Sequence, residues 1–433
     1  MPDNFVRHFS FFCVRMTNYL HKHAIYPSQI KASPRPNLNI IIVIPCHDEP
    51  DVLSSVQALR DCKPPEGSVE VIVVVNGSEQ NTTEIKQQNK LTISQLQQWI
   101  PRNTDERFQC FTLYHPDMPV KHAGVGLARK IGMDEAVWRF EKIGNPRGII
   151  ACFDADSRCD TNYLQALEQH FTQTDTVACS IYFEHPTNGT KYSEAIYKAI
   201  IDYELYLRYY VQALRFAGFP HAYQTIGSSM AVRADAYQRQ GGMNRRKAGE
   251  DFYFLQKFIP HGHYSELHNT RVIPSPRPSD RVPFGTGKAV GDLIEADTSY
   301  LAYHPNVFID LKTFIQKINT LYDKKSDAEM SEFTDNLPDS IGTFLIQYHF
   351  YKKIKEIHQH TSNERTFKQR FFQWFNAFMV LKYVHHARDR YHPSVPVYEA
   401  AMWLLQEIKI NISPEANTKV LLDIYRKLER NST

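Results

Sequence analysis

The stretch Gly148-Ile-Ile-Ala-Cys-Phe-Asp-Ala-Asp156 places two aspartates directly after a short apolar run. Two similar runs come before it, Leu38-Asn-Ile-Ile-Ile-Val-Ile-Pro45 and Val69-Glu-Val-Ile-Val-Val-Val75, and a helical pattern that starts near Pro50 separates them. Short β-branched runs alternating with helical patterns are typical of βαβ units, whose parallel sheet is buried on both faces. We therefore predict an α/β domain over residues 38–270.

Polar residues follow each of these runs. In open α/β sheets, ligands bind outside the carboxyl ends of the strands. The first run leads to Glu49, the second to Asn76, and the third to Asp154 and Asp156. Two carboxylates at i and i+2 can face the same side and suit Mg²⁺ or Mn²⁺ carrying phosphates. An isolated Asp-x-Asp is more often a solvent-exposed turn, but the apolar run before this pair places it at the ligand edge of the sheet.

Two further segments carry charges that suit an active site. A glycine-containing turn that begins at Lys121 leads into a helix with Arg129, where cations and backbone amides could meet an anionic ligand; a solvated helix start is equally compatible. Gly249 precedes Glu250 and Asp251, an acidic pair that opens a helix. The helix dipole would keep such a pair ionised and suited to act as a base, although an ordinary acidic first turn has the same pattern.

In this order, these pieces resemble the family-two glycosyltransferases of the GT-A fold. The resemblance runs from about Asn39 to Phe258 and includes Gly227 and the pair at 241–242. It implies a Rossmann-like domain that transfers a sugar from a nucleoside diphosphate donor to an acceptor hydroxyl, with Mn²⁺ or Mg²⁺ as cofactor. It also implies a role in glycan or glycolipid biosynthesis.

The resemblance implies roles for the residues that would hold the donor. Glu49 and Asn76 would line the nucleoside pocket, and Lys121 or Arg129 would lie near the base or the diphosphate. The family often has Asp where this chain has Asn76, so the resemblance leaves open whether the base is uracil or guanine.

The resemblance also implies the reacting groups. Asp154 would reach the ribose side and Asp156 would ligate the metal, with Asp154 as its second candidate ligand. Asp251 would deprotonate the acceptor, with Glu250 as its neighbour, in a reaction that inverts the anomeric configuration of the sugar; retention of that configuration, which some GT-A enzymes with similar motifs show, stays open. No Gln-x-x-Arg-Trp motif follows Asp251, which argues against a processive polymer synthase.

Residues 271–292 are rich in proline and glycine and are predicted to be a loop. Arg277 and Arg281 in this loop could close over the diphosphate; a flexible linker with incidental charges is equally compatible. Residues 293–433 are predicted to be a helical region, whose last helix would begin at Ser413-Pro414 and bury Leu421 and Tyr425.

Residues 1–37 are predicted to be an N-terminal helical extension. Its apolar residues recur every three or four positions, which favours a helix packed on the main domain, with a membrane surface as the alternative; they are Phe5, Phe9, Phe12, Met16 and Leu20. Tyr203, Tyr206, Tyr209 and Tyr210 also have helical spacing, so core packing is favoured over stacking on an acceptor sugar.

Composition narrows the class of protein. Fifty basic residues against 47 acidic ones leave a charge of +3, which is too balanced for a nucleic-acid coat protein. The seven cysteines include no C-x-x-C pair, so a zinc site or a disulfide framework is not expected, and a reducing compartment is favoured. No apolar run is long enough to span a bilayer. We expect a cytoplasmic protein, with the inner membrane surface as a peripheral alternative.

Two other function classes remain open at this point. One is a GT-A-like domain that binds a nucleotide-sugar or glycan without turnover, against which the presence of Asp156 and Asp251 argues. The other is a phosphatase with Asp154 as nucleophile, which is less favoured because such a nucleophile is expected after the first strand. For the transferase, the acceptor is a glycan, a lipid-linked molecule or a small molecule.

Overall fold

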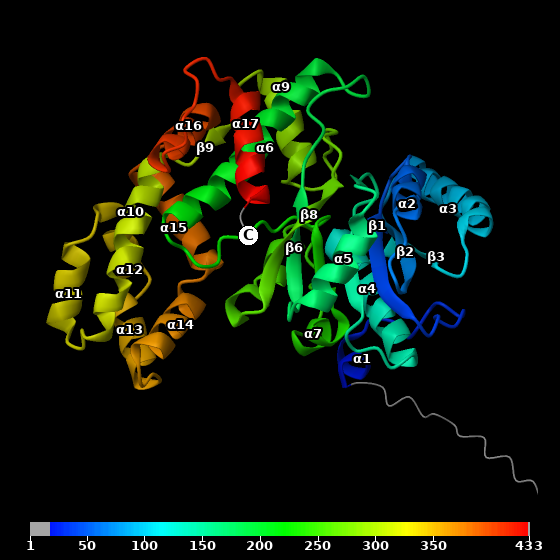
Figure 1. Ribbon diagram of the computed structural model, residues 1–433, viewed down its shortest axis with the longest axis horizontal. Helices are drawn as coiled ribbons and strands as arrows, with labels where there is room; N and C mark the ends of the chain where they lie inside the picture. The colour runs from blue at the N-terminus through cyan, green and yellow to red at the C-terminus, as the bar shows by residue number, and fades with distance from the viewer. Residues whose placement is uncertain (1–17, 432–433) are drawn as a thin grey trace, which may run out of the picture.

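The computed structural model describes residues 18–431, which form an α/β domain and a helical region (Figure 1). The α/β domain contains an eight-stranded sheet of order β3-β2-β1-β4-β7-β6-β8-β5. The predicted α/β fold with a mostly helical C-terminal region is confirmed. The strands are Leu38–Cys46 (β1), Ser68–Ser78 (β2), Phe108–Met118 (β3), Ile149–Cys152 (β4), Arg158–Cys159 (β5), Ala178–Phe183 (β6), Met230–Arg233 (β7) and Tyr264–Ile273 (β8).

The four strands β1 to β4 are parallel and form one half of the sheet. β1 pairs with β2 on one side and β4 on the other, and β2 pairs with β3. Alternate residues of β1 enter different cores: Ile40 and Ile42 pack on one face, Ile41 and Val43 on the other. Burial on both faces explains the unbroken apolar runs. Since these strands run the same way, their polar carboxyl ends lie along one edge.

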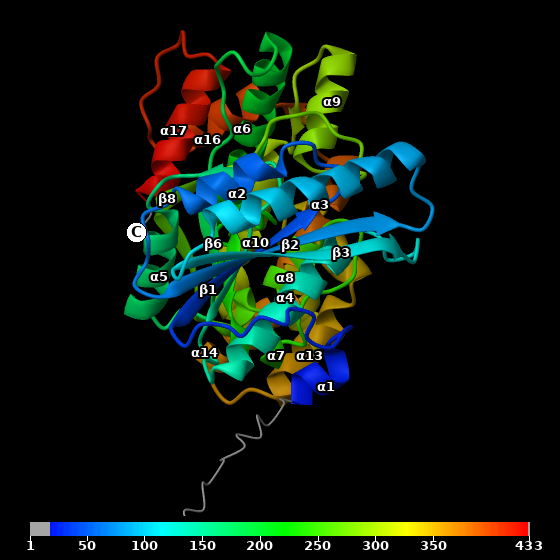
Figure 2. The same cartoon turned by 90° about the vertical axis from the view of Figure 1, so that its right-hand side faces the viewer.

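Helices cover both faces of this half of the sheet (Figure 2). α2 (Val52–Arg60) and α3 (Thr83–Asn103) cover one face, and α4 (Val125–Lys142) with α7 (Ala234–Arg239) covers the other. The remaining helices of the domain are α1 (Asn18–His23), α5 (Tyr163–Gln173), α6 (Glu194–Phe216), α8 (Glu250–Leu255) and a 3-10 turn (Ile259–His261).

The helical region packs against α6, which is shared by both parts of the molecule. In Figure 1 α17 runs beside α6, and the contacts between the two helices agree. The elements of this region are α9 (Thr286–Ala296), α10 (Pro305–Lys317), a 3-10 turn (Ile318–Tyr322), α11 (Asp327–Asp335), α12 (Asp339–Gln347), α13 (Phe350–Gln359), α14 (Glu364–Trp374), α15 (Ala377–Arg390), α16 (Val397–Glu407), α17 (Thr418–Arg430) and the two-residue strands β9 (Leu301–Ala302) and β10 (Val395–Pro396).

A buried ionic network joins α17 to α6. Arg208 of α6 pairs with Glu204 on the same helix and with Glu429 of α17, and all three residues are almost completely buried. Gln224 also donates to Glu429, at 3.0 Å. Breaking a buried ion pair leaves an uncompensated charge, so this network fixes the last helix on the α/β domain.

Three sequence-based boundaries need correction. The 271–292 segment is not a loop throughout, because its first residues continue β8 and Ile273 pairs with Arg158 of β5. Its end forms α9, where Val290 is buried against α6, so packing outweighs the two glycines in that helix. The last helix begins at Thr418 rather than near Pro414, because the Asn417 side chain caps it at the Val420 amide.

The structure describes only part of the predicted N-terminal helical extension. Phe5, Phe9, Phe12 and Met16 lie outside the described residues. Leu20 on α1 is buried in the core beside α4, as expected for a helix packed on the main domain. No helix between residues 18 and 431 has both the length and the apolar character needed to cross a bilayer.

Candidate functional site

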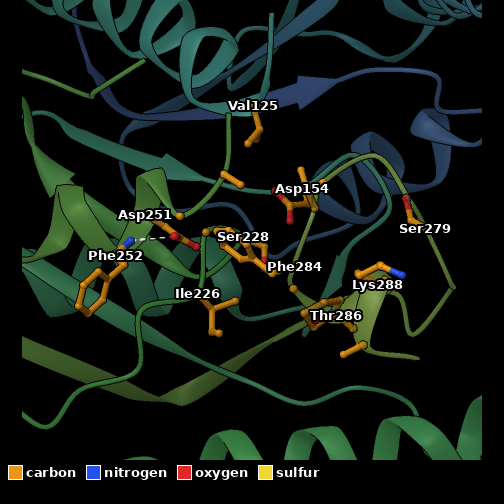
Figure 3. Close-up of a pocket in the computed structure, with 18 of the residues that line it drawn as sticks. Val125, Asp154, Ile226, Ser228, Asp251, Phe252, Ser279, Phe284, Thr286 and Lys288 are labelled. Atoms are coloured by element: carbon orange, nitrogen blue, oxygen red, sulfur yellow. Dashed lines mark hydrogen bonds between the residues drawn. The ribbon is translucent and has the colours of Figure 1, made fainter. Parts of the chain in front are cut away.

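One large cavity, of about 1130 Å³, lies at the carboxyl edge of β1, β2 and β4. Its walls come from these strand ends, from the start of α8, from one face of α6, from residues 274–301 and from the start of α15. Figure 3 shows Asp154 and Asp251 at the cavity, together with Phe284, Thr286 and Lys288. The cavity therefore lies at the edge of the sheet where the sequence predicts a ligand site.

The ends of β1 and β2 contribute Glu49 and Asn76, as predicted. Both residues are buried and line the cavity. The Asn76 carbonyl accepts a hydrogen bond from Asn89 Nδ2 at 3.0 Å, which ties the carboxyl end of β2 to α3. Glu49 accepts hydrogen bonds from Arg277 and from the Asp51 amide, so its carboxylate is held in place rather than solvated.

The end of β4 contributes the aspartate pair. Asp154 and Asp156 both line the cavity and remain partly exposed. Loss of surrounding water, with the neighbouring charges of Asp154 and Glu49, raises the pKa of Asp156 to about 6. Arg277 lies 3.4 Å from Asp156 and partly offsets these effects. Burial and the neighbouring carboxylates thus disfavour the ionised form of Asp156, which a bound cation would favour.

Arg129 is a buried link between two of the acidic segments. Its guanidinium donates to Glu250 and to Asp154. A Cβ on Gly227 would lie 2.5 Å from Arg129 Nη1, which explains why a glycine stands at that close approach. Arg129 lines the cavity as predicted, but its charge is taken up by these two carboxylates.

Asp251, the candidate base, is an acidic residue whose pKa is raised. It opens α8 after Gly249, whose φ of 68° is a left-handed conformation that favours glycine. Burial and the adjacent Glu250 raise the pKa of Asp251 to about 7. Desolvation and the charge of Glu250 thus oppose the ionised form of Asp251, which the helix dipole alone would favour. A base whose pKa lies near the working pH is well suited to proton transfer.

Residues 274–285, which we call the strap, cross the cavity beside the strand ends. Arg277 donates to Glu49, and Arg281 donates to the His47 carbonyl at 2.8 Å. The strap thus places two cations over the carboxyl ends of β1 and β4. Lys121, by contrast, is exposed and does not line the cavity. The structure brings together every predicted site residue except Lys121.

The residues present fit a divalent metal that arrives with a ligand. Residues 18–431 contain no cluster of three His, Cys, Asp or Glu side chains that could hold a metal alone. Mg²⁺ and Mn²⁺ are commonly bound by one or two carboxylates together with substrate phosphates. Asp156 meets this need, since it lines the cavity beside Arg277, and burial together with the neighbouring Asp154 and Glu49 raises its pKa.

A second end of the cavity was not assigned from the sequence. Tyr203, Tyr206 and Tyr210 line it from α6, and Tyr300 packs against Tyr206 with ring centroids 4.6 Å apart. Burial, Tyr300 and the charge of Asp251 raise the pKa of Tyr203, so this wall lies near the candidate base. The tyrosines with helical spacing are therefore both core residues and cavity wall.

His185 is a cavity residue that sequence reasoning missed. It follows β6 in the stretch Ala178-Cys-Ser-Ile-Tyr-Phe-Glu-His185, an apolar run with a polar end. The rule that identified the residues after β1, β2 and β4 would have found it.

The family comparison adds to this geometry. Residues 149–301 match the model described as Glycosyl transferase family group 2. The matched glycosyltransferase region begins at β4 and ends at β9, so it contains Asp154, Asp156, Glu250 and Asp251. The resemblance to family-two glycosyltransferases, and the GT-A-like fold that it implied, are confirmed.

Solved structures and curated proteins add less. The crystal structure of S. aureus TarS 1-349 in complex with UDP-GlcNAc aligns at 12% identity and a TM-score of 0.41, over 75% of this chain and 92% of that chain. The same fragment in complex with UDP aligns at 12% identity over the same shares, with a TM-score of 0.38. Likeness at this level carries no functional argument. Among curated proteins, none matches the chain.

Proposed function

We propose that this protein is a metal-dependent glycosyltransferase that moves a sugar from a nucleoside diphosphate donor to an acceptor hydroxyl with inversion. The observation that carries the proposal is the meeting of Asp156 and Asp251 in one cavity, within the region that matches a glycosyltransferase family. One carboxylate suits a cation that carries a diphosphate, and the other suits proton abstraction.

In the proposed reaction, Asp251 takes the proton of the acceptor hydroxyl as the acceptor oxygen attacks the anomeric carbon. The bond from that carbon to the diphosphate breaks, and the nucleoside diphosphate leaves with the electron pair. A divalent metal, when bound at Asp156, would neutralise charge that develops on the leaving phosphates.

The other residues of the donor end bind and orient. Glu49 and Asn76 line the part of the cavity assigned to the nucleoside, and Asp154 is the candidate for the ribose. Arg277 and Arg281 supply cations for the diphosphate, and the strap would keep water away from the donor. Glu250 and Arg129 hold the segment around Asp251 in place.

Calorimetric titration tests the donor site. UDP, GDP and their common sugar conjugates are titrated into the wild type and Asp156→Asn, each with and without Mn²⁺. We expect one nucleotide to bind in a Mn²⁺-dependent manner and Asp156→Asn to lose that dependence. Asp175→Asn, an exposed aspartate outside the cavity, is the matched control and should bind as the wild type does. The proposal fails if no nucleotide binds the wild type under either condition.

A further inference from the structure

Two free thiols lie side by side in the α/β domain, outside the cavity. Cys62 follows α2 and Cys159 belongs to β5, and their Sγ atoms are 3.6 Å apart. The two residues are 97 positions apart in the sequence, so it is the fold that brings them together. A disulfide has an S–S length of about 2.0 Å, so an approach of about 1.6 Å would join the two sulfurs.

The backbones of both cysteines are held in place. The Cys62 amide donates to the Leu59 carbonyl at 3.3 Å, and its sulfur, as a thiol, donates to the Ala58 carbonyl at 3.3 Å. Cys159 is paired with Val272 of β8. The folded chain therefore keeps the two sulfurs close, which makes bond formation between them an intramolecular step.

The surroundings give the two thiols different roles. The pKa of the Cys62 thiol is lowered, because Cys159 donates a hydrogen bond to its sulfur. The amides of Tyr163 and Leu164, in the first turn of α5, lower it further, and together these contacts outweigh burial. The same hydrogen bond, together with burial, raises the pKa of Cys159 well above its usual range. Cys62 is therefore the nucleophile, and Cys159 is the thiol that resolves the oxidised form of Cys62.

The pair lies in a region where α2 already holds the segment after β4. Ser55 of α2 donates to the Ala155 carbonyl at 2.7 Å, and the Lys63 amide donates to the Thr161 carbonyl at 2.7 Å. Asp156 lies between these two points in the sequence. Neither cysteine lines the cavity, so a bond between them would strengthen the support of Asp156 without entering the donor site.

We propose that Cys62 and Cys159 form a site of reversible oxidation, at which hydrogen peroxide joins them in a disulfide that fastens the Asp156 segment to α2. The inference goes beyond the proposed function and does not rest on it. Cys62 is 8% exposed and Cys159 is partly exposed, so the pair is open to a small oxidant such as hydrogen peroxide rather than to a bulky one.

The proposed oxidation has two steps. The Cys62 thiolate attacks one oxygen of the peroxide, the O–O bond breaks, and the hydroxide that leaves takes the proton that Cys62 has lost. Cys62 is then a sulfenic acid. The Cys159 sulfur attacks the Cys62 sulfur, the S–O bond breaks, and the departing hydroxide takes the Cys159 proton. Two thiols and one peroxide thus give one disulfide and two waters, and dithiothreitol reverses the bond by thiol–disulfide exchange.

Mass spectrometry of the peroxide-treated protein, with EDTA present to keep metal ions off the thiols, tests the disulfide. We expect the wild type to lose the mass of two hydrogen atoms, proteolytic fragments to show Cys62 linked to Cys159, and dithiothreitol to restore both thiols. Cys110→Ala removes a buried cysteine of β3 and is the matched control, which should form the same link. Failure of the wild type to form this link, or a link between other cysteines in its place, overturns the proposal.

Two further variants test the roles of the two thiols. A serine hydroxyl can keep the hydrogen bond to the remaining sulfur. In Cys159→Ser the sulfenic acid of Cys62 has no thiol to resolve it, so dimedone should label Cys62. In Cys62→Ser dimedone should label Cys159 about tenfold more slowly or less, because the thiolate is the reactive form. Faster labelling of Cys159 than of Cys62 would show that the roles are assigned wrongly.

The melting temperature tests whether the bond fastens the segment. A disulfide between residues 97 positions apart restricts the unfolded chain, so oxidation should raise the melting temperature of the wild type and of Cys110→Ala by several degrees. Dithiothreitol should remove the gain, and peroxide should produce none in Cys159→Ser. If the link forms and the melting temperature falls or stays the same, the bond strains the segment instead, and the proposed role is wrong.

Discussion

Arg277 Nη2 lies 3.4 Å from Asp156 Oδ2. The same guanidinium donates to Glu49, so one side chain of the strap connects the ends of β1 and β4. Arg277 thus lies between Glu49, assigned to the nucleoside of the proposed donor, and Asp156, assigned to its diphosphate. Arg277 is therefore the counter-ion of the site before a ligand arrives and a candidate phosphate ligand afterwards.

Arg277→Gln is predicted to weaken binding of the nucleoside diphosphate by about tenfold or more, since hydrogen bonds to charged groups are worth about 1.5–3 kcal/mol. Calorimetry in the presence of Mn²⁺ measures the change. Lys121→Gln removes a cation that does not line the cavity and should leave affinity almost unchanged. Wild-type affinity in Arg277→Gln would mean that Arg277 serves only Glu49 and Asp156.

The pKa of Asp251 predicts the pH dependence of the reaction. Burial and Glu250 raise it to about 7. A base must be deprotonated, so kcat/KM should be level above this pH and fall about tenfold for each pH unit below it. Asp251→Asn should lower kcat by about 10²- to 10⁴-fold without weakening donor binding. A profile that is flat between about pH 5 and 8 would exclude Asp251 as the base.

The buried carboxyl of Asp251 is also predicted to lower the free energy of unfolding at high pH. The pKa of Asp251 is about 7 in the folded protein, which is higher than its ordinary value of 3.8. At a pH between these two pKa values the folded protein binds more protons than the unfolded chain. The free energy of unfolding therefore decreases as the pH rises through this range. Asp251→Asn removes this cost. It should raise the melting temperature by a few degrees at about pH 8, and the gain should shrink as pH falls toward about 4. A gain that does not depend on pH would point to a change in packing instead.

The buried position of Arg129 predicts a large loss of stability when its charge is removed. Arg129→Met would leave Glu250 and Asp154 without their shared partner, which should lower the free energy of unfolding by about 3–5 kcal/mol. Urea denaturation measures this. The control is Arg60→Met, which breaks the more exposed pair with Asp105 and should cost less than about 1 kcal/mol.

The sequence predicted the ligand edge of the sheet well, for a physical reason. β1, β2 and β4 are buried on both faces, so they contain apolar runs, and polar residues begin at or near the carboxyl end of each strand. Glu49, Asn76 and Asp154 could therefore be placed from local information alone. His185 obeys the same rule and could have been found with it.

Features that depend on distant contacts could not be predicted in this way. α9 forms despite its glycines because Val290 packs on α6, and the start of α17 is set by the Asn417 cap. The pKa of Asp251 depends on how deeply its carboxyl is buried, which the acidic pattern in the sequence does not contain. Lys121 was misplaced because a basic residue near a turn gives no information on the direction of its side chain.

The attachment of α17 to α6 has a consequence for how the chain is made. Arg208 and Glu429 are 221 positions apart in the sequence, and Arg426 of α17 donates a hydrogen bond to Glu204. During synthesis, Arg208 and Glu204 emerge long before Glu429 and Arg426 do, so until then α6 has its own Arg208–Glu204 pair without the partners from α17. The network around Glu204 can thus reach its final form only after residues 418–430 have left the ribosome, and a truncation before Thr418 would leave Arg208 and Glu204 buried without these partners in a chain prone to aggregate.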